Sequence, residues 1–246
     1  MSKRALAIDL IVLLAVWFVA AEALDLRMLP SPLQVLEVFW SELTEGKLGM
    51  HLLISTRRIL ISTALGVALA APLAIVAAQL QLLDRFLTPL MYFLYPVPKV
   101  VFLPVILVFL GLTDTSRVFL ITLIIFFQVY VIVRDAAGQV RPETLDSVYS
   151  LGASRWHMLR YVYIPVTIPA IMTALKISAG TAIAVLFIAE SFATTTGLGY
   201  YIMIESWGRV AYANMYAGIL AISLLGSILF LVTSFLERRL GRWRER

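Results

Sequence analysis

The sequence predicts an all-α protein that crosses a membrane about six times. Of its 246 residues, 61% are hydrophobic and only 14% are charged, whereas soluble globular domains have roughly 45 to 50% apolar and about 25% charged residues. The mean hydropathy is +0.92. A β-barrel would show short segments of alternating polarity, but runs such as VFLPVILVFLGL are continuously apolar. The bilayer is therefore the expected solvent for most of the chain.

Six segments have the length and apolar content of membrane-spanning helices, which need about 18 or more predominantly apolar residues. They cover residues 7–24, 52–80, 86–111, 116–135, 165–192 and 211–236. No convincing repeat or low-complexity tract divides the chain. We therefore predict one transmembrane domain over residues 1–246, with its core helices within 52–236.

The first segment, residues 7–24, has two interpretations. Its basic start, apolar middle and small residues near the end are typical of a cleaved signal peptide. An uncleaved helix is favoured because Asp9 shortens the apolar core of such a signal and the stretch continues to Leu26. Cleavage would leave the remaining topology unchanged.

Residues 31–47, between the first two spans, predict an amphipathic helix at the outer interface of the membrane. Apolar residues recur at near-helical spacing from Leu33 to Leu43, and Ser31 and Pro32 suit a helix start. An ordinary solvated loop is the alternative.

The distribution of basic residues predicts the orientation. The formal net charge is +5, and in so apolar a chain this charge is expected on the cytoplasmic side of the membrane rather than on a nucleic-acid-binding surface. If the N-terminus is cytoplasmic, the inside collects Lys3, Arg4, Arg85, Arg134, Arg141, Arg155, Arg160 and the tail ERRLGRWRER. The outside keeps Arg27, Lys47, Arg117 and Arg209. Both termini and the loop 138–164 are thus predicted to be cytoplasmic.

The loop 138–164 is more strongly patterned than a simple connection requires. Pro142 and Glu143 suit the first turn of a helix. Gly152 permits a break, and Ser154 can cap a second short helix that ends where Pro165 opens the next span. The apolar face of the first helix consists of Leu145, Val148, Tyr149 and Leu151. The pattern predicts a helix-turn-helix on the inner membrane surface, with side chains available to a partner.

This loop resembles the EAA loop of binding-protein-dependent ABC importer permeases. The family pattern is Glu-Ala-Ala, three residues, Gly, nine residues, then an aliphatic, any residue, an aliphatic and Pro. Here the triplet is Asp146, Ser147 and Val148, the glycine is Gly152, and the end is Val162, Ile164 and Pro165. All the spacings fit, although only the acid of the triplet is kept in kind.

The resemblance extends over most of the chain. The stretches that carry it include GKLGMHLLISTRRIL (46–60), YPVPKVVFLPVILVFLG (95–111), LKISAGTAIAVLFIAE (175–190) and TTGLGYYI (195–202). Together they are similar to the permease branch that serves nitrate, sulfonates, taurine and thiamine precursors. The cargo itself is not identified by the sequence.

The resemblance implies a type I ABC importer permease fold in a bacterial or archaeal inner membrane. It also implies a dimer of permeases, by default a homodimer, with two ATPase subunits and a periplasmic or lipid-anchored solute-binding protein. The residues that would couple to the ATPase are Glu143, Asp146, Ser147, Val148, Tyr149, Leu151, Gly152, Ala153, Ser154, Arg155 and Pro165. The chain has no GxxxxGK[ST] phosphate loop, so ATP and Mg²⁺ are expected on the partner ATPase, with no cofactor bound directly and no catalysis by this chain.

Charged residues within spans are candidates for the translocation path. The candidate set is Tyr95, Lys99, Glu190 and Ser191. Lys99 follows Pro96 and Pro98, which should distort the helix and free carbonyl groups, so it either attracts an anionic solute or pairs with those carbonyls or an acid. Glu190 either lines the path or is an acid at a helix end near the outer surface. The turn that follows, TTTGLGYYI, either contacts the binding protein or seals the outer side.

Other classes of protein fit less well. The chain has no cysteine, and His51 and His157 lie on opposite predicted faces of the membrane, so no shared metal site or catalytic pair is expected. A membrane-embedded enzyme would need a clustered polar set that is missing. The main alternative is a stand-alone secondary transporter or channel, for which the spans offer few acids beyond Asp9, Asp135 and Glu190.

Overall fold

The computed structural model of the chain describes residues 3–240, and every regular element in this range is helical. The elements are α1 (Lys3–Leu24), α2 (Pro32–Thr44), α3 (Leu48–Gln79), α4 (Gln81–Leu94), the 3-10 helix η1 (Lys99–Phe102), α5 (Leu103–Leu110), α6 (Asp114–Gly138), α7 (Pro142–Ser150), α8 (Arg155–Met158), the π-helix η2 (Leu159–Tyr163), α9 (Ile164–Ser191), α10 (Leu198–Tyr200), the π-helix η3 (Tyr201–Ser206), the 3-10 helix η4 (Trp207–Arg209) and α11 (Tyr212–Leu240). Residues 241–246 of the predicted cytoplasmic tail, and the side chains of Lys3 and Arg4, lie outside this description.

Four helical segments of the described chain are long and apolar enough to cross a membrane, or five if one bent pair counts as a span. The four are Leu48–Gln79, Asp114–Gly138, Arg155–Ser191 and Tyr212–Leu240, and the bent pair is Gln81–Leu94 with Lys99–Leu110. The predicted first span, 7–24, lies within α1, which is not among the four. The predicted third span, 86–111, is not one continuous helix, because it is bent by 85° between α4 and η1.

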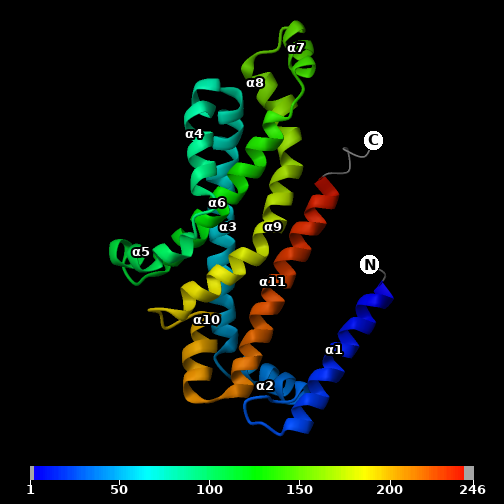
Figure 1. The fold of residues 1–246 in the computed structure, drawn as a ribbon, viewed down its shortest axis with the longest axis vertical. Coiled ribbons are helices and arrows are strands. Elements are labelled where there is room, and N and C mark those ends of the chain that lie inside the picture. The colour runs from blue at the N-terminus through cyan, green and yellow to red at the C-terminus, as the bar shows by residue number, and fades with distance from the viewer. Residues whose placement is uncertain (1–2, 241–246) are drawn as a thin grey trace. The chain divides into compact units, whose positions relative to one another are not determined.

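The chain forms two compact units. One contains residues 1–56 and 190–225, and the other contains residues 57–189 and 226–246. The first unit thus includes α1, α2 and α10, and the second includes α4 to α8 (Figure 1). Three helices, α3, α9 and α11, contribute residues to both.

In the first unit, α2 is an amphipathic helix whose start is fixed by Ser31. The Ser31 hydroxyl accepts a hydrogen bond from the Gln34 amide at 3.4 Å, and Pro32 occupies the first turn, where no donor is needed. Val35 and Phe39 are buried, whereas Trp40 is exposed. Its neighbour α1 is tied to the chain before α2, because Trp17 Nε1 donates to the Pro30 carbonyl at 3.1 Å.

In the second unit, α3 and α6 approach each other closely. A Cβ at Gly66 would lie 2.7 Å from Ile125 Cγ2, so only glycine fits there. Hydroxyl groups join the same helices: Ser62 Oγ donates to the Val118 carbonyl at 3.2 Å, and Thr122 Oγ1 donates to the Ser62 carbonyl at 3.4 Å. Small residues and hydroxyl bonds are typical of helix packing in membranes.

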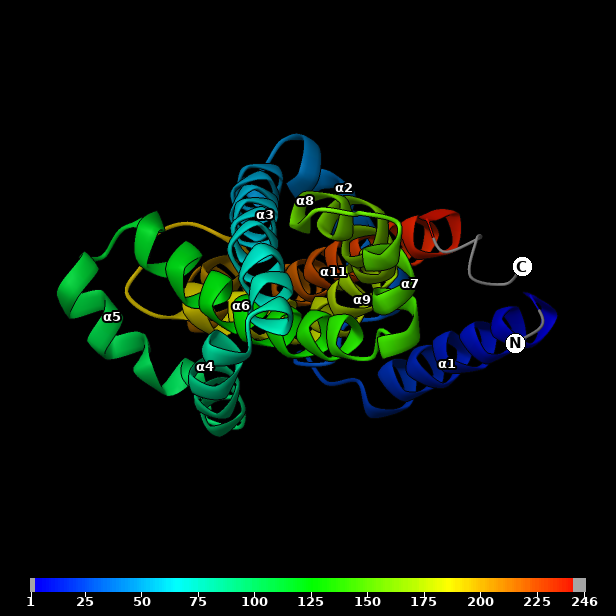
Figure 2. The same cartoon turned by 90° about the horizontal axis from the view of Figure 1, so that it is seen from above.

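Ion pairs connect two further pairs of helices in the second unit. Arg134 on α6 binds Asp84 on α4, with Nη2 2.5 Å from Oδ2, and Figure 2 shows α4 beside α6. Arg57 and Arg58 on α3 both pair with Asp114 in the first turn of α6. Both arginines thus connect α3 with α6.

The expected break before Pro165 is absent. Residues 155–191 form one continuous helical segment, in which α8 passes through the π-helix η2 into α9. Pro165 lies just after the wider π turn, near the start of α9. A π turn breaks the usual i to i−4 pattern of hydrogen bonds, so a proline beside it disrupts less than one inside a regular α-helix.

Candidate functional site

The bend between α4 and η1 exposes backbone that a bilayer cannot solvate. Pro96 and Pro98 lack an N–H group, so the carbonyl groups of the preceding turn lose their helical partners. The Lys99 ammonium binds carbonyl groups of the bend instead, because Nζ donates to the carbonyl oxygens of Leu94, Tyr95 and Val97 at 2.6, 2.9 and 3.1 Å. The Leu94 carbonyl also accepts from the Val97 amide at 3.2 Å. An ammonium has three donors, and these contacts use all three.

Lys99 is buried and its charge is partly balanced by an aromatic ring. Its Nζ lies 4.2 Å from the centre of the Phe127 ring, a distance at which a cation is attracted by the ring face. Of the two interpretations of Lys99, the contacts support the pairing with carbonyls of the broken helix. Lys99 still contributes a positive electrostatic field, but it has no donor left for direct bonding to a solute.

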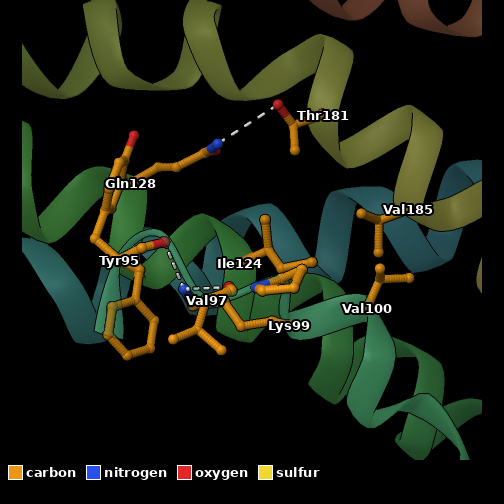
Figure 3. Close-up of a pocket in the computed structure, with 10 residues that line it drawn as sticks. Tyr95, Val97, Lys99, Val100, Ile124, Gln128, Thr181 and Val185 are labelled. Carbon is orange, nitrogen blue, oxygen red and sulfur yellow. Dashed lines mark hydrogen bonds between the residues drawn. The ribbon is translucent and has the colours of Figure 1, made fainter. Parts of the chain in front are cut away.

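A cavity of about 270 Å³ lies beside this bend, between η1, α6 and α9 (Figure 3). Its lining consists of Tyr95, Val97, Pro98, Lys99, Val100, Ile124, Phe127, Gln128, Thr181 and Val185. Most of these side chains are apolar, and none is an acid. The cavity is therefore an apolar space with a positive field and a few polar groups, the usual composition of a small-molecule site.

Three residues with uncharged polar groups line this cavity, namely Tyr95, Gln128 and Thr181. Figure 3 shows the Gln128 side chain extending from α6 toward Thr181 on α9, and Gln128 Nε2 lies 3.5 Å from Thr181 Oγ1. Among the described residues, Gln128 Oε1 is buried and has no hydrogen-bond partner. Gln128 and Thr181 were not predicted from the sequence, because single polar residues in apolar helices carry no local signal of their spatial neighbours.

Of the predicted path residues, Tyr95 and Lys99 line this cavity, whereas Glu190 and Ser191 belong to the other unit. Glu190 is fully buried. It accepts hydrogen bonds from the Ser55 hydroxyl at 2.7 Å and from the Gly199 amide at 3.2 Å. Ser55 also accepts from the Leu198 amide at 2.8 Å. Through these hydrogen bonds, Glu190 and Ser55 connect the turn that follows Glu190 to the first part of α3.

His51 joins the same turn to a second acid. The Gly197 amide donates to His51 Nδ1 at 3.0 Å, which leaves the proton on Nε2, and Nε2 lies 3.0 Å from Glu205 Oε2. Lys47 also donates to Glu205, at 2.9 Å. Burial on its own would raise the pKa of the Glu205 carboxyl, but Lys47 and His51 together hold it below its usual range. His51 and Ser55 are four residues apart on α3 and so share a helix face.

The loop 138–164 contains the two helices that its pattern predicts, although the second continues into α9. The first, α7, begins at Pro142 with Glu143 in its first turn. The chain then turns at Gly152, whose φ of +78° favours glycine. Ser154 caps α8 by accepting from the His157 amide at 3.4 Å, and the His157 ring bonds back to Ser154.

The loop presents large apolar side chains at its surface. Leu151 is 87% exposed, Trp156 63% and Tyr149 51%. The remaining loop candidates, Asp146, Ser147 and Arg155, are exposed, and Val148 and Ala153 are half-buried. A groove of about 380 Å³ runs between Tyr149, Trp156 and the last turn of α3 at Gln79. Exposed apolar groups on an aqueous surface are typical of sites that contact another protein.

These features define a multi-spanning membrane protein with a cavity beside a broken helix. Residues 70–242, more than half of the chain, match the family of binding-protein-dependent transport system inner membrane components. The chain belongs to this family and is an ABC transporter permease.

Relatives and a solved structure agree with this assignment. The chain is 32% identical over 242 residues to the taurine transport system permease protein TauC of Escherichia coli (strain K12), covering 95% of this chain and 87% of TauC. It is 27% identical over 237 residues to the putative aliphatic sulfonates transport permease protein SsuC of Bacillus subtilis (strain 168), covering 95% and 85%. A chain of the MetNI methionine ABC transporter, in an inward-facing conformation, matches with a TM-score of 0.64 at 15% identity, covering 78% of this chain and 95% of that one. This last match shows the shared fold, which is that of an ABC importer permease.

Proposed function

We propose that the chain is the membrane subunit of an ATP-driven importer and that its loop 138–164 transmits movement from an ATPase. The observation that carries this proposal is the surface of the loop, where Tyr149, Leu151 and Trp156 are exposed around the glycine turn. Short helices that present apolar side chains fit grooves on partner proteins. The coupling residues are those from Glu143 to Arg155 named above, with Pro165 at the start of the span.

The proposed assembly has two ATPase subunits, a second permease subunit that is a copy of this chain, and a solute-binding protein outside the membrane. ATP and Mg²⁺ are bound by the ATPase, and this chain carries out no catalysis. Both termini lie on the cytoplasmic side of the inner membrane of a bacterium or archaeon. The family of the chain supports the ATPase and permease partners, and the basic residues of the sequence support the orientation.

The proposed cargo is a small organic solute with an anionic group, such as taurine or another sulfonate. Two relatives carry these cargoes in their names. The cavity beside Lys99 supports the sign of the charge, because it contains one cation and no acid among its lining residues.

The coupling role is tested by replacing Gly152 with Asp and, as a matched control, with Asn. Both residues tolerate a positive φ better than most, and no atom lies within 4 Å of the position of a new Cβ. The two variants therefore differ mainly in charge. An unpaired charge at a protein interface costs several kcal/mol. The amount of ATPase bound to the Asp variant should therefore be lower than that bound to the Asn variant by a factor of roughly ten or more.

The measurement is affinity purification of the tagged chain from its native membrane in mild detergent, followed by quantification of the bound ATPase. Equal retention of ATPase by the Asp variant and the wild type would exclude this loop as the docking surface. A wild-type chain that purifies alone, and transports taurine into liposomes without ATP, would refute the importer.

A further inference from the structure

We propose that the groove between the loop 138–164 and the end of α3 binds the headgroup of an anionic phospholipid, and that Arg155 and Tyr163 contact its phosphate. The groove has a volume of about 380 Å³ and shares no lining residue with the cavity beside the broken helix. Its ligand is a component of the membrane rather than the cargo. The proposal therefore goes beyond the importer function and does not depend on it.

The groove lies where two spanning segments end. Gln79 is the last residue of α3, and Arg155 is the first residue of the helical segment 155–191; both line the groove. The ends of membrane-spanning helices lie near the headgroup region of the bilayer. Tyr149 and Trp156 also line the groove, and Tyr and Trp are enriched at this depth of a membrane. A lipid headgroup can therefore reach the groove without leaving the bilayer.

The charge of the groove fits an anion. Its lining contains one cation, Arg155, and no acid. Arg155 is exposed and forms no ion pair with any other described residue. Guanidinium groups bind phosphates through two parallel hydrogen bonds, and basic pockets between membrane helices on the cytoplasmic side bind lipid headgroups. An anionic headgroup is favoured over a zwitterionic one, because the ammonium group of the latter would find no acid in the groove.

Tyr163 provides a second, independent observation. It is only 7% exposed, yet it lines the groove. Its hydroxyl has no hydrogen-bond partner among residues 3–240. The unpaired side-chain atoms that are fully enclosed in this range are Gln128 Oε1, Ser206 Oγ and Ser234 Oγ, so the Tyr163 hydroxyl is not one of them. It is open to the groove and can donate to a phosphate oxygen.

The apolar part of the groove favours a lipid over a soluble phosphate compound. Val76, Leu80 and Leu159 line it. The first part of an acyl chain can lie against these side chains and bury apolar surface, which stabilises the complex. A soluble phosphate compound has no chain to bury there.

The lipid and the proposed ATPase can bind the loop together. Leu151 is 87% exposed and does not line the groove. The glycine turn therefore remains available to the ATPase while the lipid lies between α8 and α3. We expect the lipid to stay bound when the ATPase is present.

The test is native mass spectrometry of the full-length permease in detergent, with and without the copurified ATPase. The probes are phosphatidylglycerol, which is anionic, and phosphatidylcholine, which is zwitterionic, with identical acyl chains. The wild type should bind the first phosphatidylglycerol about fivefold more tightly than the first phosphatidylcholine, which is the contribution of about one basic residue near an anionic headgroup.

Variants of Arg155 test the charge. Arg155→Gln should bind the two lipids with affinities that agree within about twofold, because the cation is lost, and Arg155→Lys should restore the preference. Arg160→Gln is the matched control, since Arg160 is an exposed arginine of the same segment that does not line the groove. It changes the net charge equally and should keep the wild-type preference.

A variant of Tyr163 tests the contact with the phosphate. Tyr163→Phe should weaken the binding of both lipids by about fivefold, the contribution of one hydrogen bond, and should keep their order, because both lipids carry a phosphate. If this variant does not fold, the variants at the exposed Arg155 still test the site.

Equal binding of the two lipids by the wild type overturns the proposal, as does an unchanged preference in Arg155→Gln. Loss of the lipid when the ATPase binds also overturns it, because the groove would then belong to the ATPase. Glycerol 3-phosphate that binds as tightly as the lipid would identify a soluble phosphate compound as the occupant, against the proposal. A failure of the importer function is distinct from these results, since a permease that purifies without an ATPase would still bind phosphatidylglycerol.

Discussion

Replacement of Gly197 by Ala should strongly destabilise the turn at residues 192–197 in the first unit. Gly197 has a φ of +106°, and an added Cβ would lie 2.3 Å from Glu190 Cδ and 2.5 Å from both carboxylate oxygens. The side chain of Glu190 would have to move, although it is fully buried and accepts hydrogen bonds from Ser55 and Gly199. The substitution thus combines backbone strain with the loss of buried hydrogen bonds.

The two contributions give the magnitude. Backbone strain at such a φ costs about 1–3 kcal/mol, and a buried polar group that loses its partner costs about 1–3 kcal/mol. We therefore expect a loss of about 4 kcal/mol in the free energy of unfolding. For a chain of this size, that corresponds to a Tm lower by roughly 8–16 °C.

The assay is thermal unfolding of the purified protein in detergent, with Gly180→Ala as the control. Gly180 lies inside α9, its φ is not positive, and no atom lies within 4 Å of a new Cβ. Alanine is the better helix former by about 1 kcal/mol, so this variant should melt at or slightly above the wild-type temperature. Equal melting temperatures for the two variants would refute the steric reasoning about Glu190.

Further predictions concern Lys99 and Glu205. Lys99→Met should lower the free energy of unfolding by about 2 kcal/mol or more, because the carbonyl groups of Tyr95 and Val97 lose the Lys99 donor, whereas the Leu94 carbonyl keeps its bond from the Val97 amide. Lys176→Met, which removes a partly exposed pair with Glu237, should cost about 0–1 kcal/mol, and similar losses in denaturant titration would contradict the proposed role of Lys99. Glu205→Gln should cost about 1 kcal/mol at neutral pH. Because the pKa of Glu205 is lowered in the folded protein, its stabilisation is present above the unfolded carboxyl pKa of about 4.3 and is lost as the pH falls through the folded value. The difference in Tm between wild type and Glu205→Gln should therefore shrink in acid, and a difference that grows there would refute the assignment.

The helical fold follows from the sequence because its signals are local. Long apolar runs, Pro142 at the start of α7, Gly152 at a turn and Ser154 at a cap each act through neighbouring residues. Pro96 and Pro98 likewise predict a distorted helix. The failure at Pro165 is also local in origin, since a π turn before the proline maintained a helix that simple proline rules would end.

The candidate sites were harder to predict because their contacts span large separations in sequence. Ser55 and Glu190 lie 135 residues apart, and Gln128 and Thr181 lie 53 apart. Nothing in the residues around Gln128 indicates that its amide oxygen is buried beside a cavity. Lys99 was partly predictable. Its carbonyl partners are close in sequence, but the choice between a structural and a solute-binding lysine required the geometry of the bend.

The unbroken helix from Arg155 through residue 189 has a mechanical consequence. At about 1.5 Å per residue, this segment is roughly 50 Å long, so tilting it by about 10° around one end would carry the other end through about 9 Å. If the segment moves as one body, a small rotation at α8 is therefore accompanied by a large displacement of the far end of α9. The π turn at Leu159–Tyr163 departs from regular α-helical hydrogen bonding, and helices bend most readily at such turns. The stiffness of this turn therefore decides whether α8 and α9 move together.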